Sequence, residues 1–246
     1  MNALTNGATI QIEGTNKKYH TLDDWELAIG NNDYIGDPEQ ELNYIDVVGR
    51  NSPIDVSDAL IGRPSYKKRE IKMNMGGIRS RNGWDNIISD IRNKIDGRIV
   101  HVIFDNDKQY YWRGRIHVQD FDRNNRLGTF TLIMPQADPY KYEVSSVTEP
   151  WLWDPFSFVD GVIRNFGELV VNGTATMMIP KGHMYTVPEF QVSATSEIIM
   201  TDGNREYKLT AGKNRFPSLL VNGDDEVNLS FKGQGTVTID YRGGSL

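Results

Sequence analysis

One stretch of this chain has the period of an α-helix, whereas the other periodic runs are short and alternate. In residues 82–97 (NGWDNIISDIRNKIDG), large apolar side chains recur every three or four residues on one helix face: Trp84, Ile87, Ile88, Ile91 and Ile95. We expect a helix at about residues 83–96, capped by Asn82 and ended by Gly97. Because glycine, asparagine and aspartate interrupt the other runs so densely, a mainly β protein with one helix is predicted.

The first half of the chain is predicted to place strands on both sides of that helix. Residues 9–14 and 66–75 alternate, and the second run ends with Ile71, Met73 and Met75 on one face. After the helix, a meander of strands is expected at 98–105, 109–121 and 127–134. Residues 1–142 should therefore form an N-terminal β-barrel or sandwich domain with one packed α-helix.

Past Pro150 the sequence carries strand patterns alone. Turn signals recur at Asn172–Gly173, which is a strong hairpin pair, and again at 202–204, 211–213 and 233–235. Strands separated by such turns at intervals of about 8–12 residues are typical of antiparallel sandwiches. We therefore expect a C-terminal antiparallel β-sandwich at residues 143–246.

The stretch MPQADPYKYEV (134–144) lies between the two predicted domains. Pro135 cannot donate to a continuing strand ladder, and Pro139 favours an extended Asp138. Tyr140 and Tyr142 lie two residues apart, so both rings can face the same side. We expect these five residues to form an interdomain joint, with both tyrosines packed on the N-terminal domain. Replacing both with alanine is then expected to loosen the interdomain angle.

Charge divides the first half into two tracts of opposite sign. Residues 21–62 hold ten acidic side chains and one base, Arg50, whereas residues 63–126 hold fifteen bases and eight acids. Such tracts can be solvated faces, can neutralise each other within one fold, or can pair between copies in a head-to-tail ring. The net charge of −6 disfavours nonspecific nucleic-acid binding, and no apolar run is long enough for a membrane helix.

No catalytic, cofactor or metal-binding constellation is recognisable. The chain has no cysteine, which suits a reducing compartment, and its polar N-terminus does not read as a signal peptide. His101 and His117 fall in strands expected to be neighbours, but a third metal ligand is missing. We expect no cofactor, no metal and no enzymatic activity, and instead a structural or binding protein.

Two aromatic groups are candidate contact surfaces. Tyr110, Tyr111 and Trp112 are consecutive, so both faces of their strand carry rings and one face is a candidate oligomer or partner interface. Trp151 and Trp153 share a strand face and form a candidate platform, which either buries an interdomain contact or stacks on a sugar ring. The second option leaves open an alternative function, a carbohydrate-binding module that adheres to host cell-wall glycans.

The order of these features resembles the distal tail protein (Dit) family of long-tailed siphophages, in its minimal form. The resemblance is carried by REIKMNM, the helix, FDNDKQYYWRGRI and the ADPYKY junction, over about residues 69–142, with the rest matching by length and domain order. It implies a ring-forming N-terminal domain, a hexameric ring and a galectin-like C-terminal domain. The galectin sugar-binding residue set is not found between residues 151 and 246.

The same resemblance implies partners and a location. A Dit protein lies at the virion tail tip, or baseplate, after assembly in the host cytoplasm. There it joins the tail tube protein to a tail-tip or tail-associated protein, and in some phages to a receptor-binding protein. It spans no membrane and reads no specific nucleic acid.

Overall fold

The computed structural model describes residues 6–30, 33–59, 62–124, 126–144 and 168–246. The chain divides into two compact units. The first comprises Met1–Asp107 and Tyr111–Lys141, and the second comprises Lys108–Tyr110 and Tyr142–Leu246. Within the described residues, the fold is mainly β with a single α-helix, as the sequence predicts.

The first unit contains the helix and most of the strands. Its elements are β1 (Ala8–Ile12), β2 (Lys18–His20), β3 (Ala28–Ile29), β4 (Tyr34–Ile35), β5 (Tyr44–Ile45), β6 (Ile54–Asp55), β7 (Arg69–Ile78), α1 (Arg81–Ile95), β8 (Ile99–Phe104), β9 (Tyr110–Arg115), β10 (His117–Arg123) and β11 (Leu127–Ala137). The second unit contains β12 (Lys141–Glu143), β13 (Leu169–Ile179), β14 (Glu189–Ser193), β15 (Ile198–Thr201), β16 (Glu206–Leu209), β17 (Gly212–Arg215), β18 (Val227–Asp240) and β19 (Gly244–Ser245).

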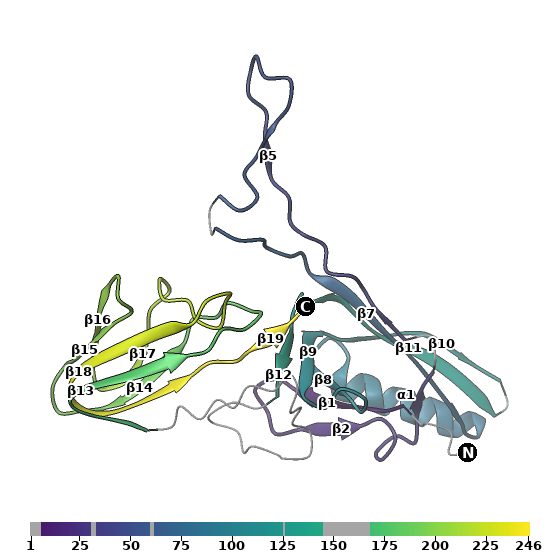
Figure 1. Ribbon diagram of the computed structural model, residues 1–246. Coiled ribbons are helices and arrows are strands. Elements are labelled where there is room, and N and C mark those ends of the chain that lie inside the picture. Colours follow the sequence, from purple (N-terminus) through teal and green to yellow (C-terminus); the bar gives the residue numbers. More distant parts are fainter. Residues whose placement is uncertain (1–5, 31–32, 60–61, 125, 145–167) are drawn as a thin grey trace. The chain divides into compact units, whose positions relative to one another are not determined.

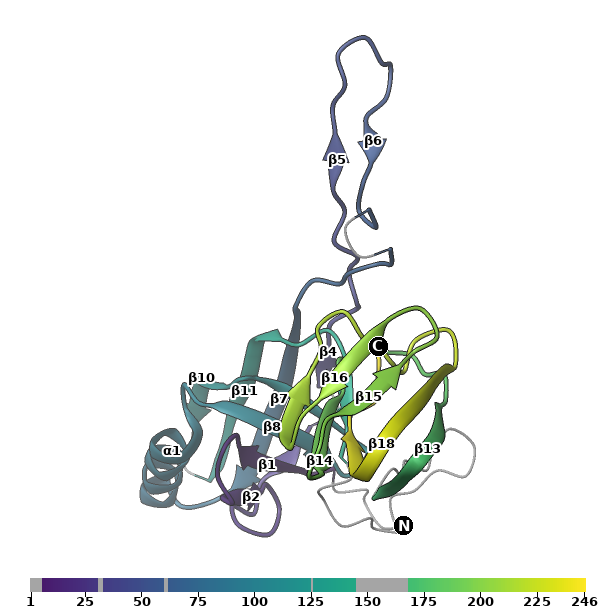
Figure 2. The same cartoon turned by 90° about the vertical axis from the view of Figure 1, so that its left-hand side faces the viewer.

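Two antiparallel sheets and the helix enclose the core of the first unit (Figures 1 and 2). One sheet runs in the order β9–β8–β1–β2, and the other runs β10–β11–β7–β3 with β4 also paired to β7. Ile10 and Val102 from the first sheet join Met73 and Leu132 from the second in one buried cluster. The predicted apolar face of β7 is confirmed, because Ile71, Met73 and Met75 are buried.

Helix α1 closes this core with the predicted stripe. Trp84, Ile88, Ile91 and Ile95 are buried, and Ile87 packs at the edge of the cluster. The prediction of Asn82 as the cap is wrong. The helix begins two residues earlier, because Ser80 has an extended backbone and its hydroxyl accepts from the Gly83 N–H at 3.2 Å. Gly97 follows the helix with φ +70°, as expected for a terminating glycine.

The strand expected at 109–121 is two strands in different sheets. β9 pairs with β8, whereas β10 pairs with β11. The chain crosses between the sheets at Ile116, whose N–H donates to the Arg98 carbonyl and whose carbonyl accepts from the Gly97 N–H. His101 and His117 therefore lie in different sheets. The expectation that their strands are neighbours is wrong.

The second unit is built around one long strand, β18. The sheet order is β16–β15–β18–β14–β17, with β13 paired along the other side of β18. β16 and β17 lie at opposite ends of this order, although two residues join them in sequence. β15 pairs with residues 230–232 and β14 with residues 236–240 along the same edge of β18, so β15–β16 and β14–β17 extend from successive parts of this strand around a core that includes Phe190 and Phe231.

Two predicted hairpin turns in this unit are wrong. β13 continues through Asn172–Gly173 and β18 through 233–235, and Gly173 pairs directly with Gly233. Gly173, Gly233 and Gly235 all have positive φ, so both strands bend together at this point. A methyl group on Gly235 would lie 2.6 Å from the Ser193 carbonyl oxygen, so glycine also makes room for the β14–β15 connection.

The signal at 211–213 is also not a hairpin, since β17 pairs with β14 and not with β16. The signal at 202–204 is a hairpin between β15 and β16, as predicted. A short pairing completes the unit: the Glu143 N–H donates to the Gly243 carbonyl at 3.0 Å, and Arg242 donates to the Glu143 and Val144 carbonyls.

Candidate functional site: an apolar arm and an exit segment

A long two-stranded arm projects from the first unit (Figures 1 and 2). It comprises residues 36–59 and 62–66 and leaves the sheet where β4 pairs with β7. Backbone pairing between its two sides is sparse. The Lys67 N–H donates to the Glu39 carbonyl and the Glu41 N–H donates to the Ser65 carbonyl. Further along the arm, the two-residue strands β5 and β6 pair. A ribbon this thin has little core of its own to stabilise it in water.

The arm exposes apolar side chains that a monomer would ordinarily bury. Its large exposed apolar residues are Leu42, Tyr44, Ile45, Val47, Val48 and Ile54. Tyr44 is 56% exposed and Ile45 is 53% exposed. Six carboxylates and one base, Arg50, occupy residues 36–58. Several large exposed apolar side chains interspersed with charge are typical of a protein–protein contact. In the sequence, this exposed surface corresponds to the acidic tract and the short apolar runs within it.

A buried arginine lies where the arm meets the body of the unit. The Arg69 guanidinium donates to the Gly36 carbonyl at 3.3 Å and to the Pro139 carbonyl, and it stacks over the Trp112 ring at 4.8 Å. Burial lowers the pKa of Arg69, while the charge of Asp37 opposes that shift. One side chain thus joins the first residue of the arm to the segment that ends the unit.

Residues 137–141, the exit segment, are fastened to the first unit at further points. The Asp138 N–H donates to the Arg113 carbonyl at 2.8 Å, and the Tyr140 ring meets the Tyr66 ring edge-on at 6.0 Å. Burial raises the pKa of Tyr140, and the electrostatic effect of the neighbouring Tyr66 adds to the increase. The Lys141 ammonium pairs with Asp107 at 2.7 Å.

The expectation that Pro135 ends its strand is wrong. β11 continues to Ala137, which pairs with Arg69, and an irregularity in register between Met134 and Ala137 accommodates the proline that has no N–H. Of the two tyrosines expected to pack on the first unit, Tyr140 does so and Tyr142 belongs to the second unit. The joint itself stays a prediction.

An ion-pair network fixes the beginning of the exit segment. Arg113 donates to both carboxylate oxygens of Glu13, at 2.7 and 2.9 Å, and to Asp138 at 3.2 Å. His101 lies 3.6 Å from Glu13 and stacks on Tyr111 at 4.3 Å. The hydrogen bonds from Arg113 lower the pKa of Glu13, outweighing the opposing effect of burial.

This network predicts a loss of stability in acid. A carboxylate with a lowered pKa in the folded state contributes stability that is present above its unfolded pKa and lost as the pH falls through the folded value. The free energy of unfolding should therefore fall more steeply below about pH 4.5 in the natural chain than in Glu13→Gln. Urea unfolding at several pH values measures this, and equal slopes for both chains would contradict it.

The aromatic residues predicted as contact surfaces differ in how the structure places them. Trp112 points into the core, and Tyr111 lies under His101, so both rings are buried within the chain and do not present an open partner surface. Tyr110 groups with the second unit and is partly buried. Trp151 and Trp153 lie outside the described residues.

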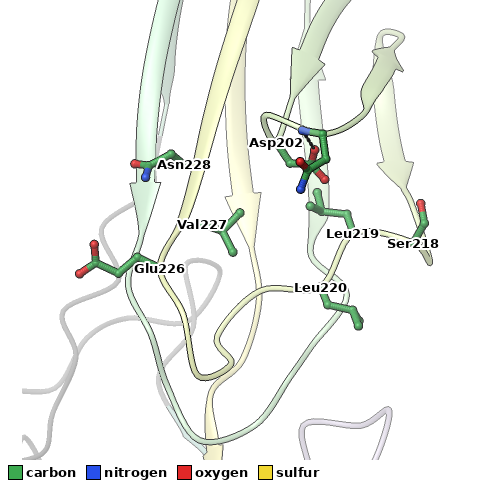
Figure 3. Close-up of a pocket in the computed structure, with 8 residues that line it drawn as sticks. Asp202, Ser218, Leu219, Leu220, Glu226, Val227 and Asn228 are labelled. Atoms are coloured by element: carbon green, nitrogen blue, oxygen red, sulfur yellow. Dashed lines mark hydrogen bonds between the residues drawn. The ribbon is translucent and has the colours of Figure 1, made fainter. Parts of the chain in front are cut away.

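Among the described residues, two open hollows on the surface are candidate binding sites. One, of about 390 Å³ in the second unit, is lined by Asp202, Glu226 and neighbouring residues (Figure 3). Asp202 already accepts from the Tyr207 hydroxyl and from two backbone N–H groups. The other, of about 440 Å³, lies over β7 and β11 near Asn74 and Thr131. The first has no aromatic ring among its lining residues on which a sugar could stack.

The described residues contain no cluster of three or more side chains suited to hold a metal ion. Among the same residues, no helix is both long and apolar enough to cross a lipid bilayer. The surface that stands out among the described residues is the exposed apolar arm.

The architecture is that of a Dit-like β protein. The chain is similar in structure to the crystal structure of SPP1 Dit (gp 19.1), described as a paradigm of the hub adsorption apparatus in phages that infect Gram-positive bacteria. The match covers 96% of this chain and 98% of that chain, with a TM-score of 0.56 and 13% sequence identity. At that identity the likeness concerns the fold. No protein-family model and no curated protein matches the sequence.

Proposed function

We propose that this chain is a structural component of a phage tail: a hub that forms a ring, most simply a hexamer, at the distal end of the tail tube. The ring joins the tube protein on one side to the tail-tip or tail-associated protein on the other, and the second unit, galectin-like in this proposal, carries receptor-binding or baseplate proteins. It acts by assembly and not by catalysis, and it resides at the virion tail tip after assembly in the host cytoplasm.

The observation that carries the proposal is the likeness to a phage hub protein along nearly the whole length of both chains. Two features of this chain support it independently. The first unit has an exposed apolar arm, and its acidic and basic tracts offer complementary surfaces for a head-to-tail assembly.

Assembly state is the decisive property to measure. We expect the purified chain at micromolar concentration to form a closed oligomer in light scattering. Negative-stain images should show a ring with six-fold symmetry and a central hole. A strictly monomeric chain at low and moderate salt would count against the ring. A ring with another symmetry would contradict the hexamer and retain the hub.

A further inference from the structure

The two ends of strand β7 carry different exposed surfaces. The arm leaves the sheet beside Arg69 and Glu70, where Gly36 donates to the Glu70 carbonyl at 2.8 Å. At the other end, Ile78 pairs with Leu127 on β11, and these side chains are 77% and 51% exposed. Ten residues of strand separate the two ends, a span of about 30 Å.

Two arginines flank the exposed pair and have no acidic partner within the part of the chain that the structure describes. Arg81 begins helix α1 three residues after Ile78, and Arg126 directly precedes Leu127; both are exposed. Neither makes an ion pair with any other described residue. The neighbouring cations are already paired, Arg79 with Glu26 at 3.0 Å and Arg123 with Asp85 at 2.5 Å. Ile78, Leu127, Arg81 and Arg126 together form an apolar spot with uncompensated positive charge, the acceptor patch.

The arm has the complementary character. It combines exposed apolar side chains with six carboxylates against two bases, Arg50 and Arg63. Of these carboxylates, Glu39 has only a loose, exposed contact with Lys67 at 3.5 Å. An apolar, acidic ribbon and an apolar, basic patch are matched in both hydrophobic and electrostatic terms.

The geometry points to a contact between copies and not within one chain. Figures 1 and 2 both show the arm directed away from the sheet that carries the acceptor patch. Donor and acceptor are two different surfaces, so their pairing is heterologous and repeats from one copy to the next. We propose that the arm of one copy docks on the acceptor patch of a second copy. This inference rests on the ring proposed above and names its interface.

Breaking either surface should dissociate the assembly without unfolding the chain. The arm variant is Tyr44→Ser with Ile45→Ser and Val48→Ser, and the acceptor variant is Ile78→Glu with Leu127→Glu. Each is expected to raise the dissociation constant about 100-fold, because buried apolar area is lost and, in the acceptor variant, acidic charge then faces the acidic arm. The matched control is Val170→Ser with Met178→Ser, two exposed apolar residues of the second unit.

Mixing the two variants tests the heterologous geometry directly. The arm variant keeps its acceptor patch and the acceptor variant keeps its arm, so one intact contact forms and growth stops there. Light scattering should show each variant as a monomer and the mixture as a pair of chains. The control should keep the mass of the natural chain. Unfolding temperatures close to that of the natural chain show that both variants are folded.

The outcomes separate the two proposals. If the natural chain assembles and either variant keeps its mass, or if the mixture stays monomeric or forms the full assembly, the docking inference is overturned and the hub proposal stands. If the natural chain is a monomer at every concentration tested, both fail.

Discussion

Replacing Gly128 with alanine is expected to destabilise the first unit by about 3 kcal/mol, although it adds only one methyl group. That methyl group would lie 2.6 Å from Cδ2 of Trp84 and closer still to Cε2. The indole cannot move aside easily, because Trp84 is fully buried and its Nε1–H donates to the Arg126 carbonyl at 3.1 Å. The change therefore forces a shift of the helix against the sheet.

A glycine on the adjacent strand provides the control. A methyl group on Gly76 would meet nothing closer than 3.8 Å, so Gly76→Ala should change the unfolding free energy by less than about 0.5 kcal/mol. Urea unfolding followed by tryptophan fluorescence measures both variants. A similar, small loss for the two would mean that α1 does not press on β11 as the structure has it.

The helix and the core it closes could be predicted from sequence because both depend on local periodicity. The stripe from Trp84 to Ile95 and the alternating Ile71, Met73 and Met75 each repeat with the period of one element. The break at Ile116 could not be predicted. Alternation continues across it, and the chain changes sheets there through backbone hydrogen bonds to Arg98 and Gly97.

Turn-forming residues led to wrong hairpin predictions where glycine instead allows a bend within two paired strands. A hairpin turn and a bend in two paired strands both use backbone with positive φ, so Asn172–Gly173 reads the same in either case. What distinguishes them is that Gly173 pairs with Gly233, sixty residues away. That pairing is a long-range fact that the local sequence does not contain.

The candidate site was predictable only in part. The acidic tract and the ADPYKY junction both appear in the sequence, and Tyr140 packs on Tyr66 of the first unit. The arm was not predicted, because its short apolar runs resemble buried strands and only the structure shows them exposed. Arg69 was also missed, since its partners Gly36, Trp112 and Pro139 are distant in sequence.

Arg69 gives the second large expected effect. Replacement by methionine keeps a long side chain over Trp112 and removes the hydrogen bonds to the Gly36 and Pro139 carbonyls. Two acceptors near the core then lose a charged donor, at a cost of about 1–3 kcal/mol each. Because the guanidinium is desolvated and its Nε–H has no acceptor among the described residues, part of that loss is offset when the charge is removed. A net destabilisation of about 2 kcal/mol is expected.

The effect should also be local, which distinguishes it from a general loss of stability. Hydrogen exchange followed by mass spectrometry should become faster in residues 36–41 and 137–141 of Arg69→Met, because the arm base and the exit segment share this side chain. Lys67→Met is the matched control. It lies two residues before Arg69, where the chain returns from the arm. Its contact with Glu39 is exposed and 3.5 Å long, and such pairs contribute less than about 1 kcal/mol. If exchange rises in only one of the two segments, Arg69 does not join them. Faster exchange in both segments, with the second unit unchanged, means that the base of the arm and the exit segment are held by the same guanidinium.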